Sequence, residues 1–198
     1  MTLAFFDFDG TITTQDSFLD FIFFCHGILR TLWGIAVNCL FLILMILKIY
    51  PRGKTKQKIW NHFFAGWTQA KFESYAKDYI QKRLPRILRP QALEKLAWHK
   101  TQGHKIVVVS ASFENYLGFW CKKEEVNLLA TQAEIKDGKI TGQFASANCY
   151  GDEKLRRIQD AYNLKDFDFI YAYGDSRGDL PLKKIANEFY YKPFRTKN

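Results

Sequence analysis

Two carboxylates near the N-terminus stand where a strongly apolar run ends. Leu3–Phe8 is rich in phenylalanine, which is the pattern of a strand buried on both faces. Asp7 and Asp9 lie at the end of this run, and Gly10 lets the chain turn at once so that both acids can reach one pocket. Buried charges need partners, so acids in such a run favour a chemical role over a turn with solvated side chains.

Groups that could hold a phosphate occur later in the chain. Ser110 follows the strand-like run Lys105–Val109, and a serine capping a helix is its ordinary role. If a helix opens here, the backbone N–H groups of Ala111 and Ser112 would suit a phosphate oxygen. Lys154 stands in the first turn of another predicted helix, where a cation opposes the helix dipole. An anion nearby would explain Lys154, and a solvated surface position is the alternative.

Two more acids follow the aromatic, strand-like run Phe167–Tyr173. Asp175 and Asp179 lie in Gly174–Asp179, where glycines allow a close approach of the chain. Carboxylate oxygens at a strand end suit a hard cation such as Mg²⁺, and two turn aspartates are the alternative. Taken together, the four segments predict a site for a phosphate group and magnesium.

The elements that must position these residues indicate an α/β fold. From position 91 onward, strand-like and helix-like segments alternate, which predicts a Rossmann-like parallel sheet with helices on both faces. Ligands collect at the carboxyl ends of the strands in such sheets, so the four segments can converge. We expect residues 1–14 and 86–198 to form the catalytic core.

The segment 15–85 has no convincing strand and is predicted to be an all-helical cap inserted after the first strand. Its apolar spacing favours four helices. The expected ranges are Ser17–Cys25, Leu29–Ile49, Lys56–Ala65 and Gln69–Arg83.

These residues resemble the haloacid dehalogenase superfamily of phosphohydrolases over nearly the whole chain. The corresponding motifs are hhhDxDGT at Phe5–Thr11, a strand ending in Ser110, the lysine Lys154, and GDxxxD at Gly174–Asp179. The resemblance implies that the first acid, Asp7, is the nucleophile that forms an aspartyl phosphate. It implies that the second, Asp9, is the general acid and base, which favours hydrolysis.

The same resemblance implies the remaining contacts. Mg²⁺ would be held by Asp7, the backbone carbonyl of Asp9, and Asp175. Asp179 would orient the metal ligands or Lys154. The phosphoryl oxygens would be held by Thr11, Ser110, Ala111 and Lys154.

Different parts of this chain resemble two branches of the superfamily. The helical insertion and the hairpin Asp137–Gly142 are similar to the phosphoserine phosphatase-like branch, subfamily IB. Asp16 stands where that branch uses a glutamate to hold the substrate amine, so Asp16 is a candidate substrate contact. Gly151–Lys154, Asp175–Ser176 and Asp179–Leu182 are similar to the bacterial phosphatidylglycerophosphatase C-like branch, which combines a hydrophobic cap with a lipid phosphate substrate.

Composition limits the partners. The formal net charge of +9 favours an anionic partner, which could be a phosphate ester, an acidic membrane surface or nucleic acid. The predicted site selects a phosphorylated small molecule or lipid, and no nucleic acid partner is expected. Four scattered cysteines indicate reduced thiols in the cytoplasm, and no signal peptide is expected at the N-terminus.

The uncharged stretch Thr31–Leu47 is at the short limit for a membrane span. A single crossing would separate Asp7 from Asp175, so we expect a buried cap helix, a dimer contact or a helix in the membrane interface. Five lysines and arginines between Lys48 and Lys58, with Trp33, Trp60 and Trp67, favour an anionic membrane surface.

The favoured function is therefore a magnesium-dependent phosphomonoester hydrolase, peripheral on the inner face of the membrane. Its expected substrate is a membrane lipid phosphate such as phosphatidylglycerophosphate. The alternatives are a soluble phosphatase or phosphotransferase for a phosphoserine-like or phosphocholine-like metabolite, and a basic binding module with a decayed site. The presence of every motif acid argues against the last.

Overall fold

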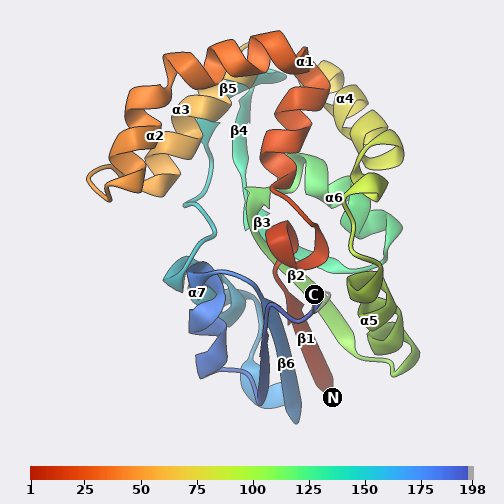
Figure 1. The fold of residues 1–198 in the computed structure, drawn as a ribbon. Helices are drawn as coiled ribbons and strands as arrows, with labels where there is room; N and C mark the ends of the chain where they lie inside the picture. The colour runs from red at the N-terminus through yellow and green to blue at the C-terminus, as the bar shows by residue number, and fades with distance from the viewer. Residues whose placement is uncertain (196–198) are drawn as a thin grey trace.

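A computed structural model describes residues 1–195 of the protein. Its central sheet has five parallel strands, and helices surround the sheet (Figure 1). The strand order is β3-β2-β1-β6-β7, so the first strand lies in the middle. All neighbouring pairs are parallel, which confirms the predicted α/β fold class. The strands are β1 (Thr2–Phe6), β2 (Lys105–Phe113), β3 (Asn127–Thr131), β6 (Phe169–Gly174) and β7 (Glu188–Tyr191).

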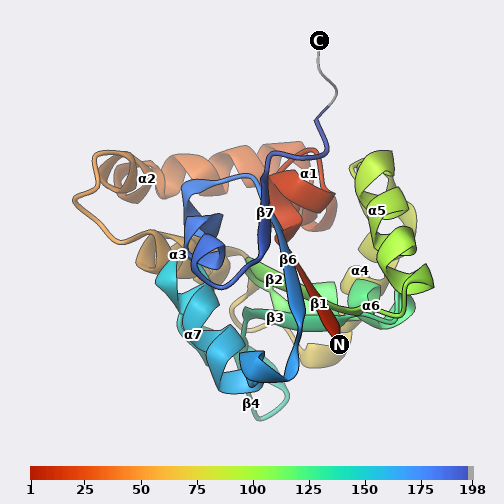
Figure 2. The same cartoon turned by 90° about the horizontal axis from the view of Figure 1, so that it is seen from below.

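Helices cover both faces of this sheet, because alternate side chains of each strand point in opposite directions. In β1, Ala4 and Phe6 belong to one hydrophobic cluster and Leu3 and Phe5 to another. The first cluster is covered by α5 and α6 and the second by α7, on opposite sides of the sheet (Figure 2). These helices are α5 (Pro90–Thr101), α6 (Glu114–Lys123) and α7 (Asp152–Ala161).

The chain between β1 and β2 supplies four helices that lie over the carboxyl ends of the strands (Figure 1). One of them, α4, matches the predicted amphipathic helix to within one residue. Short helical turns connect the larger elements: η1 (Phe8–Ile12), η2 (Leu84–Arg86), η3 (Leu164–Asp166) and η4 (Arg177–Lys184). The four helices are α1 (Ser17–Val37), α2 (Cys39–Ile46), α3 (Arg52–Phe64) and α4 (Gln69–Lys82).

The expectation of one helix over Leu29–Ile49 is wrong. Asn38 separates α1 from α2, and its side-chain amide donates to the carbonyl of Gly34 at 2.8 Å. An asparagine that bonds its own backbone in this way competes with a continuous helix. By length and composition α1 could cross a membrane, but Gly27 (φ 72°, ψ 173°) divides it into two shorter pieces.

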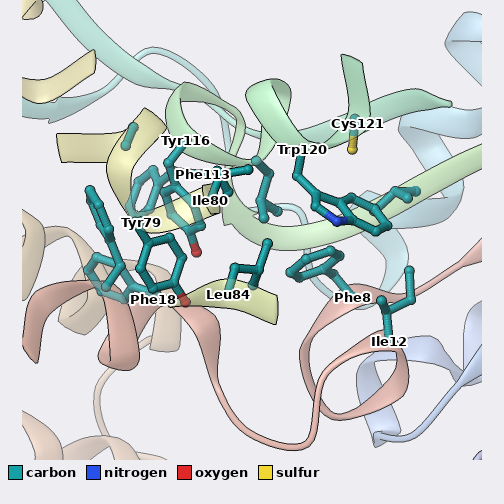
Figure 3. Packing of buried hydrophobic residues seen from close by; sticks show 14 of the residues in the cluster. Phe8, Ile12, Phe18, Tyr79, Ile80, Leu84, Phe113, Tyr116, Trp120 and Cys121 are labelled. Atoms are coloured by element: carbon teal, nitrogen blue, oxygen red, sulfur yellow. The ribbon is translucent and has the colours of Figure 1, made fainter. Parts of the chain in front are cut away.

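We call α1, α2, α3 and α4 together the helical layer. An aromatic core joins this layer to the sheet (Figure 3). Trp60 of α3 stacks on Phe113 at the end of β2, with ring centroids 4.0 Å apart. Phe21 of α1 stacks on Tyr116 of α6 at 4.9 Å. Because Trp60 is fully buried here, it is not available to a membrane interface, and that part of the sequence interpretation is wrong.

An antiparallel hairpin, β4 (Ala133–Lys136) and β5 (Lys139–Phe144), also attaches to the helical layer. The N–H of Gly66 donates to the carbonyl of Ile140 at 2.8 Å, and the N–H of Ile140 donates to that of Trp67 at 2.9 Å. The hairpin belongs by sequence to the segment 86–198, yet its backbone bonds to the chain between α3 and α4.

Candidate active site

The first strand ends in a turn that brings Asp7 and Asp9 to the same cavity. The N–H of Asp7 donates to the carbonyl of Tyr173 at 2.9 Å, which extends the pairing of β1 with β6. Gly10 then adopts φ 79°, in the left-handed region. A Cβ at Gly10 would lie 2.3 Å from Oδ2 of Asp175, so glycine is required both for the turn and for the approach of this acid.

Lys154 is a buried ammonium that joins two carboxylates. It is the third residue of α7 and is 1% exposed. Its Nζ donates to Oδ1 of Asp7 at 2.5 Å and to Oδ1 of Asp179 at 2.6 Å. Burial by itself lowers the pKa of Lys154, but the two carboxylates outweigh burial and raise this pKa above its ordinary value. Lys154 therefore stays charged, and its alternative as a solvated surface lysine is excluded.

Asp7 is held at both of its oxygens. Thr11 donates its hydroxyl to Oδ2 of Asp7 at 3.1 Å, while Lys154 holds Oδ1. Burial raises the pKa of Asp7 to about 7, against the attraction of Lys154 and together with the repulsion of Asp179. Thr11, expected at the phosphate, thus lies against the predicted nucleophile and fixes its orientation.

Three acids form a cluster next to Lys154. One carboxylate oxygen each of Asp7, Asp175 and Asp179 lie within 4.8 Å of one another. Oδ2 of Asp179 accepts from the N–H and hydroxyl of Ser176 at 2.9 and 2.8 Å, which fixes this acid in place. Burial raises the pKa of Asp175, Asp179 adds to the effect, and Arg195, at 2.8 Å, opposes it. Hard oxygen donors at such spacing fit Mg²⁺.

Asp9 is anchored at the start of α1. It accepts hydrogen bonds from the N–H of Ser17 at 2.7 Å and from the hydroxyl of Ser112. Burial raises the pKa of Asp9, Asp16 adds to the effect, and the two serines oppose it. A carboxyl group with a raised pKa can carry the proton that a general acid must deliver.

Ser110 and Ala111 lie inside a strand, so the expectation that a helix opens at Ala111 and Ser112 is wrong. β2 continues to Phe113, with an irregular pairing to β3 after Ser110, and α6 begins only at Glu114. The physical reason is local: the N–H of Ser112 donates to the hydroxyl of Ser110 at 3.0 Å. Ser110 is fully buried, whereas Ala111 lines the cavity.

Lys56 of α3 is a cavity residue that the sequence interpretation missed. Its Nζ donates to the carbonyl of Ala111 at 2.5 Å and lies 4.8 Å from the ring centroid of Phe113. Burial lowers the pKa of Lys56, against the attraction of Asp16 and Asp9. The basic run was interpreted as surface, but the spacing of Lys56 from the apolar Trp60, four residues later, could have placed it on the inner face.

These side chains surround a cavity of about 600 Å³ between the sheet and the helical layer. Asp7, Asp9, Lys154 and Asp175 line its acidic end. Asp16 also lines it while capping α1, where it accepts from the N–H of Leu19 at 2.8 Å. The remaining wall is mostly apolar and comes from α1, α2 and α3: Phe18, Leu19, Ile22, Ile35, Leu42, Met45, Ile59 and Phe63.

Curated proteins include relatives that match this chain along most of its length. Protein CicA of Caulobacter vibrioides is 33% identical over 98% of this chain and 87% of its own length. A probable phosphatase of Mycobacterium tuberculosis is 30% identical over 91% of this chain and 65% of its own length.

Solved structures share the fold. A Bordetella pertussis protein of unknown function covers 95% of this chain and 88% of its own, with a TM-score of 0.83 and 20% identity. A substrate-bound phosphoserine phosphatase covers 96% of this chain and 84% of its own, with a TM-score of 0.67 and 18% identity. Residues 4–184 match the family described as haloacid dehalogenase-like hydrolase. The predictions of an enzyme and of this superfamily are confirmed, and the chain belongs to the haloacid dehalogenase-like hydrolases.

Proposed function

We propose that this protein is a magnesium-dependent phosphomonoester hydrolase that works through an aspartyl phosphate on Asp7. The observation that carries the proposal is the setting of Asp7, which is fixed at both oxygens by Lys154 and Thr11 beside the acid Asp9. A relative named as a probable phosphatase and the fold shared with phosphoserine phosphatase support it.

The first half of the reaction transfers the phosphoryl group to the enzyme. The Asp7 carboxylate forms a bond to phosphorus as the bond from phosphorus to the leaving oxygen breaks. Asp9 gives its proton to that leaving oxygen, so that a neutral alcohol departs. Lys154 stays charged beside Asp7 and offsets negative charge on the phosphoryl oxygens. The hydroxyl of Ser110 and the N–H of Ala111 are proposed to bind the same oxygens.

The second half returns the enzyme to its starting state. Asp9, now ionised, takes a proton from a water molecule that attacks the phosphorus. The bond between phosphorus and Asp7 breaks, and inorganic phosphate leaves. Asp7, Asp175 and the carbonyl of Asp9 are the proposed ligands of Mg²⁺, which when bound reduces the repulsion between the nucleophile and the phosphate. Asp179 positions Lys154 through the bond of 2.6 Å.

The substrate is proposed to be a lipid phosphate, such as phosphatidylglycerophosphate, bound under the cap formed by residues 15–85. An apolar wall facing the acidic end suits a phosphomonoester whose alcohol part carries long apolar chains. Arg52 and Lys56 add positive charge to the same wall, which suits a leaving group with a second anionic group. A small amine-bearing phosphoester, such as phosphoserine or phosphocholine, is the alternative that the carboxylate of Asp16 favours.

Phosphate release from a panel of esters tests the proposal. The panel pairs lipid phosphomonoesters in detergent micelles with phosphoserine, phosphocholine and p-nitrophenyl phosphate, each with Mg²⁺ and with EDTA. We expect magnesium-dependent release, highest kcat/KM for the lipids, and no release by Asp7→Asn. Asp137→Asn, on the exposed hairpin turn, is the matched control. Release from no ester refutes the enzyme mechanism, whereas a preference for the soluble esters refutes only the lipid substrate.

A further inference from the structure

The outer faces of α2 and of the second half of α1 are apolar and exposed. Ten of the seventeen exposed large hydrophobic side chains among the described residues lie between positions 28 and 49. Trp33 is 70% exposed and Ile46 is 74% exposed. We call the outward side chains the outer stripe: Leu29, Trp33, Val37, Leu40, Ile43 and Ile46. A helix face in contact with water normally carries polar residues instead.

The outer stripe faces away from the core of its own chain, because the opposite face of the same helices packs against that core. Gly34 of α1 packs so closely that a Cβ there would lie 2.2 Å from the ring of Phe63. Ile35, Leu42 and Met45 line the cavity. The two helices therefore have apolar residues on both sides, with the protein on one side and the outer stripe on the other.

Charge selects the partner that covers the stripe. There is no acidic residue between Asp20 and Glu73, whereas that interval holds seven lysines and arginines. Arg30, Lys48 and Lys54 are exposed beside or just beyond the stripe. A two-fold contact between copies of this chain would bring the same cations face to face. A surface of anionic lipid complements both the apolar side chains and the cations.

We infer that the outer stripe is a docking surface for an anionic lipid membrane and that its helices lie in the interface. The piece of α1 after Gly27 is about 15 Å long and α2 about 12 Å, so each is much shorter than the hydrocarbon core of about 30 Å. At its other end α1 is tied to the active site by the bond from the N–H of Ser17 to Asp9, and the second half of α1 packs on α3 through Gly34 and Phe63.

Docking in this way puts the active-site cavity next to the lipid. Leu42 and Met45 line the cavity, whereas Leu40, Ile43 and Ile46 of the same helix face outward. A lipid phosphate would then pass from the membrane along α2 to Asp7. This lipid route rests on the proposed function, but the docking surface does not.

Co-sedimentation of the full chain with vesicles tests the surface directly. The vesicles contain equal parts of phosphatidylglycerol and phosphatidylcholine, or phosphatidylcholine alone, at low and at high salt. We expect binding to the anionic vesicles that weakens with salt. The double variant Trp33→Ser, Ile46→Ser should bind at least about tenfold more weakly, since two large apolar side chains are no longer buried in lipid. The matched control Tyr190→Ser, Tyr191→Ser changes exposed aromatics on β7 and should bind as wild type.

Tryptophan fluorescence gives an independent measure. Trp33 should be quenched by brominated lipid, and the quenching should be absent in Trp33→Phe. Vesicle binding by the stripe variant equal to that of wild type overturns the inference. A wild-type dimer that becomes a monomer in the stripe variant, with no vesicle binding by either, also overturns it in favour of a second copy. Circular dichroism of each variant confirms folding.

Hydrolysis and docking fail separately in this design. Asp7→Asn should bind anionic vesicles as wild type does, because Asp7 is buried at the cavity and is not part of the exposed outer stripe. If no ester is hydrolysed but the vesicles are bound, the docking surface stands and the proposed function falls. If esters are hydrolysed and the vesicles are not bound, the reverse holds.

Discussion

Asp7→Asn should make the metal-free protein more stable at alkaline pH. Burial raises the pKa of Asp7 from 3.8 to about 7, so the folded protein keeps a proton that the unfolded chain releases above about pH 4. Between these two values the folded state binds more protons than the unfolded state. The free energy of unfolding therefore falls as the pH rises through this window, and the loss is complete somewhat above pH 7.

The size of this effect follows from the same two pKa values. A difference of about 3 pKa units at about 1.36 kcal/mol per unit gives a loss of up to roughly 4 kcal/mol. Asparagine has nearly the same shape as aspartate and no charge, so the variant does not lose this unfolding free energy as the pH rises. Lys154 keeps Asp179 as its partner in the variant. For a chain of this size, we expect the Tm of Asp7→Asn to exceed that of wild type by roughly 10 °C at about pH 8. Near pH 4 the two proteins should have the same Tm.

Thermal unfolding followed by circular dichroism in EDTA, across this pH range, measures the difference. Asp137→Asn serves as the control, because Asp137 is an exposed turn residue. Excess Mg²⁺ should shrink or reverse the advantage, since an ion bound at the acidic cluster stabilises the folded wild type. If Asp7→Asn unfolds at or below the wild-type temperature near pH 8 in EDTA, the attraction of Lys154 exceeds the burial cost and the reasoning is refuted.

Three further substitutions probe other parts of the fold. Lys154→Met should lower the free energy of unfolding at neutral pH by about 3–5 kcal/mol, because it leaves two buried carboxylates without their cation. Urea denaturation measures this, and adding Asp179→Asn should restore part of the loss. Asp9→Asn should slow release of an alkyl alcohol at least about 100-fold, yet spare the first turnover of p-nitrophenyl phosphate, whose leaving group needs no proton. An equal loss for both esters would contradict the role of Asp9. Burial lowers the pKa of His99 to about 3, so stability should fall as the pH drops from about 6.5 toward 3, and His99→Gln should lack this part of the acid unfolding curve.

The residues predicted best from sequence are those at strand ends. Asp7 and Asp175 could be placed together because two apolar runs end at them and Gly10 marks the turn. A parallel sheet brings the carboxyl ends of its strands to one edge, so local patterns suffice to bring these acids into one cluster. The role of Lys154 is harder to predict from sequence, because a lysine in the first turn of a helix can be exposed or, as the structure shows here, buried.

Features that depend on individual side-chain contacts were not predictable in the same way. Asn38 breaks the apolar stretch through a side-chain bond to Gly34, and composition alone favoured a continuous helix. Ser110 lies in a strand that continues to Phe113, and its hydroxyl accepts from the N–H of Ser112. A helix cap would accept the same bond, so the serine alone does not distinguish a strand from a helix start. The spacing of Lys56 from Trp60 indicates the inner face of α3, but the contacts that Lys56 makes with Ala111 and Phe113 depend on the packing of α3 against β2.

The hairpin that bonds to Gly66 and Trp67 limits how this enzyme can admit its substrate. A hinge motion that lifted the helices off the sheet as one lid would break these two backbone bonds and unstack Trp60 from Phe113. Small rearrangements of α2 against α3 carry no such cost, because no strand pairing ties α2 down. Substrate entry and product release should therefore depend on the mobility of α2. Stiffening this helix should slow turnover without altering the chemical step.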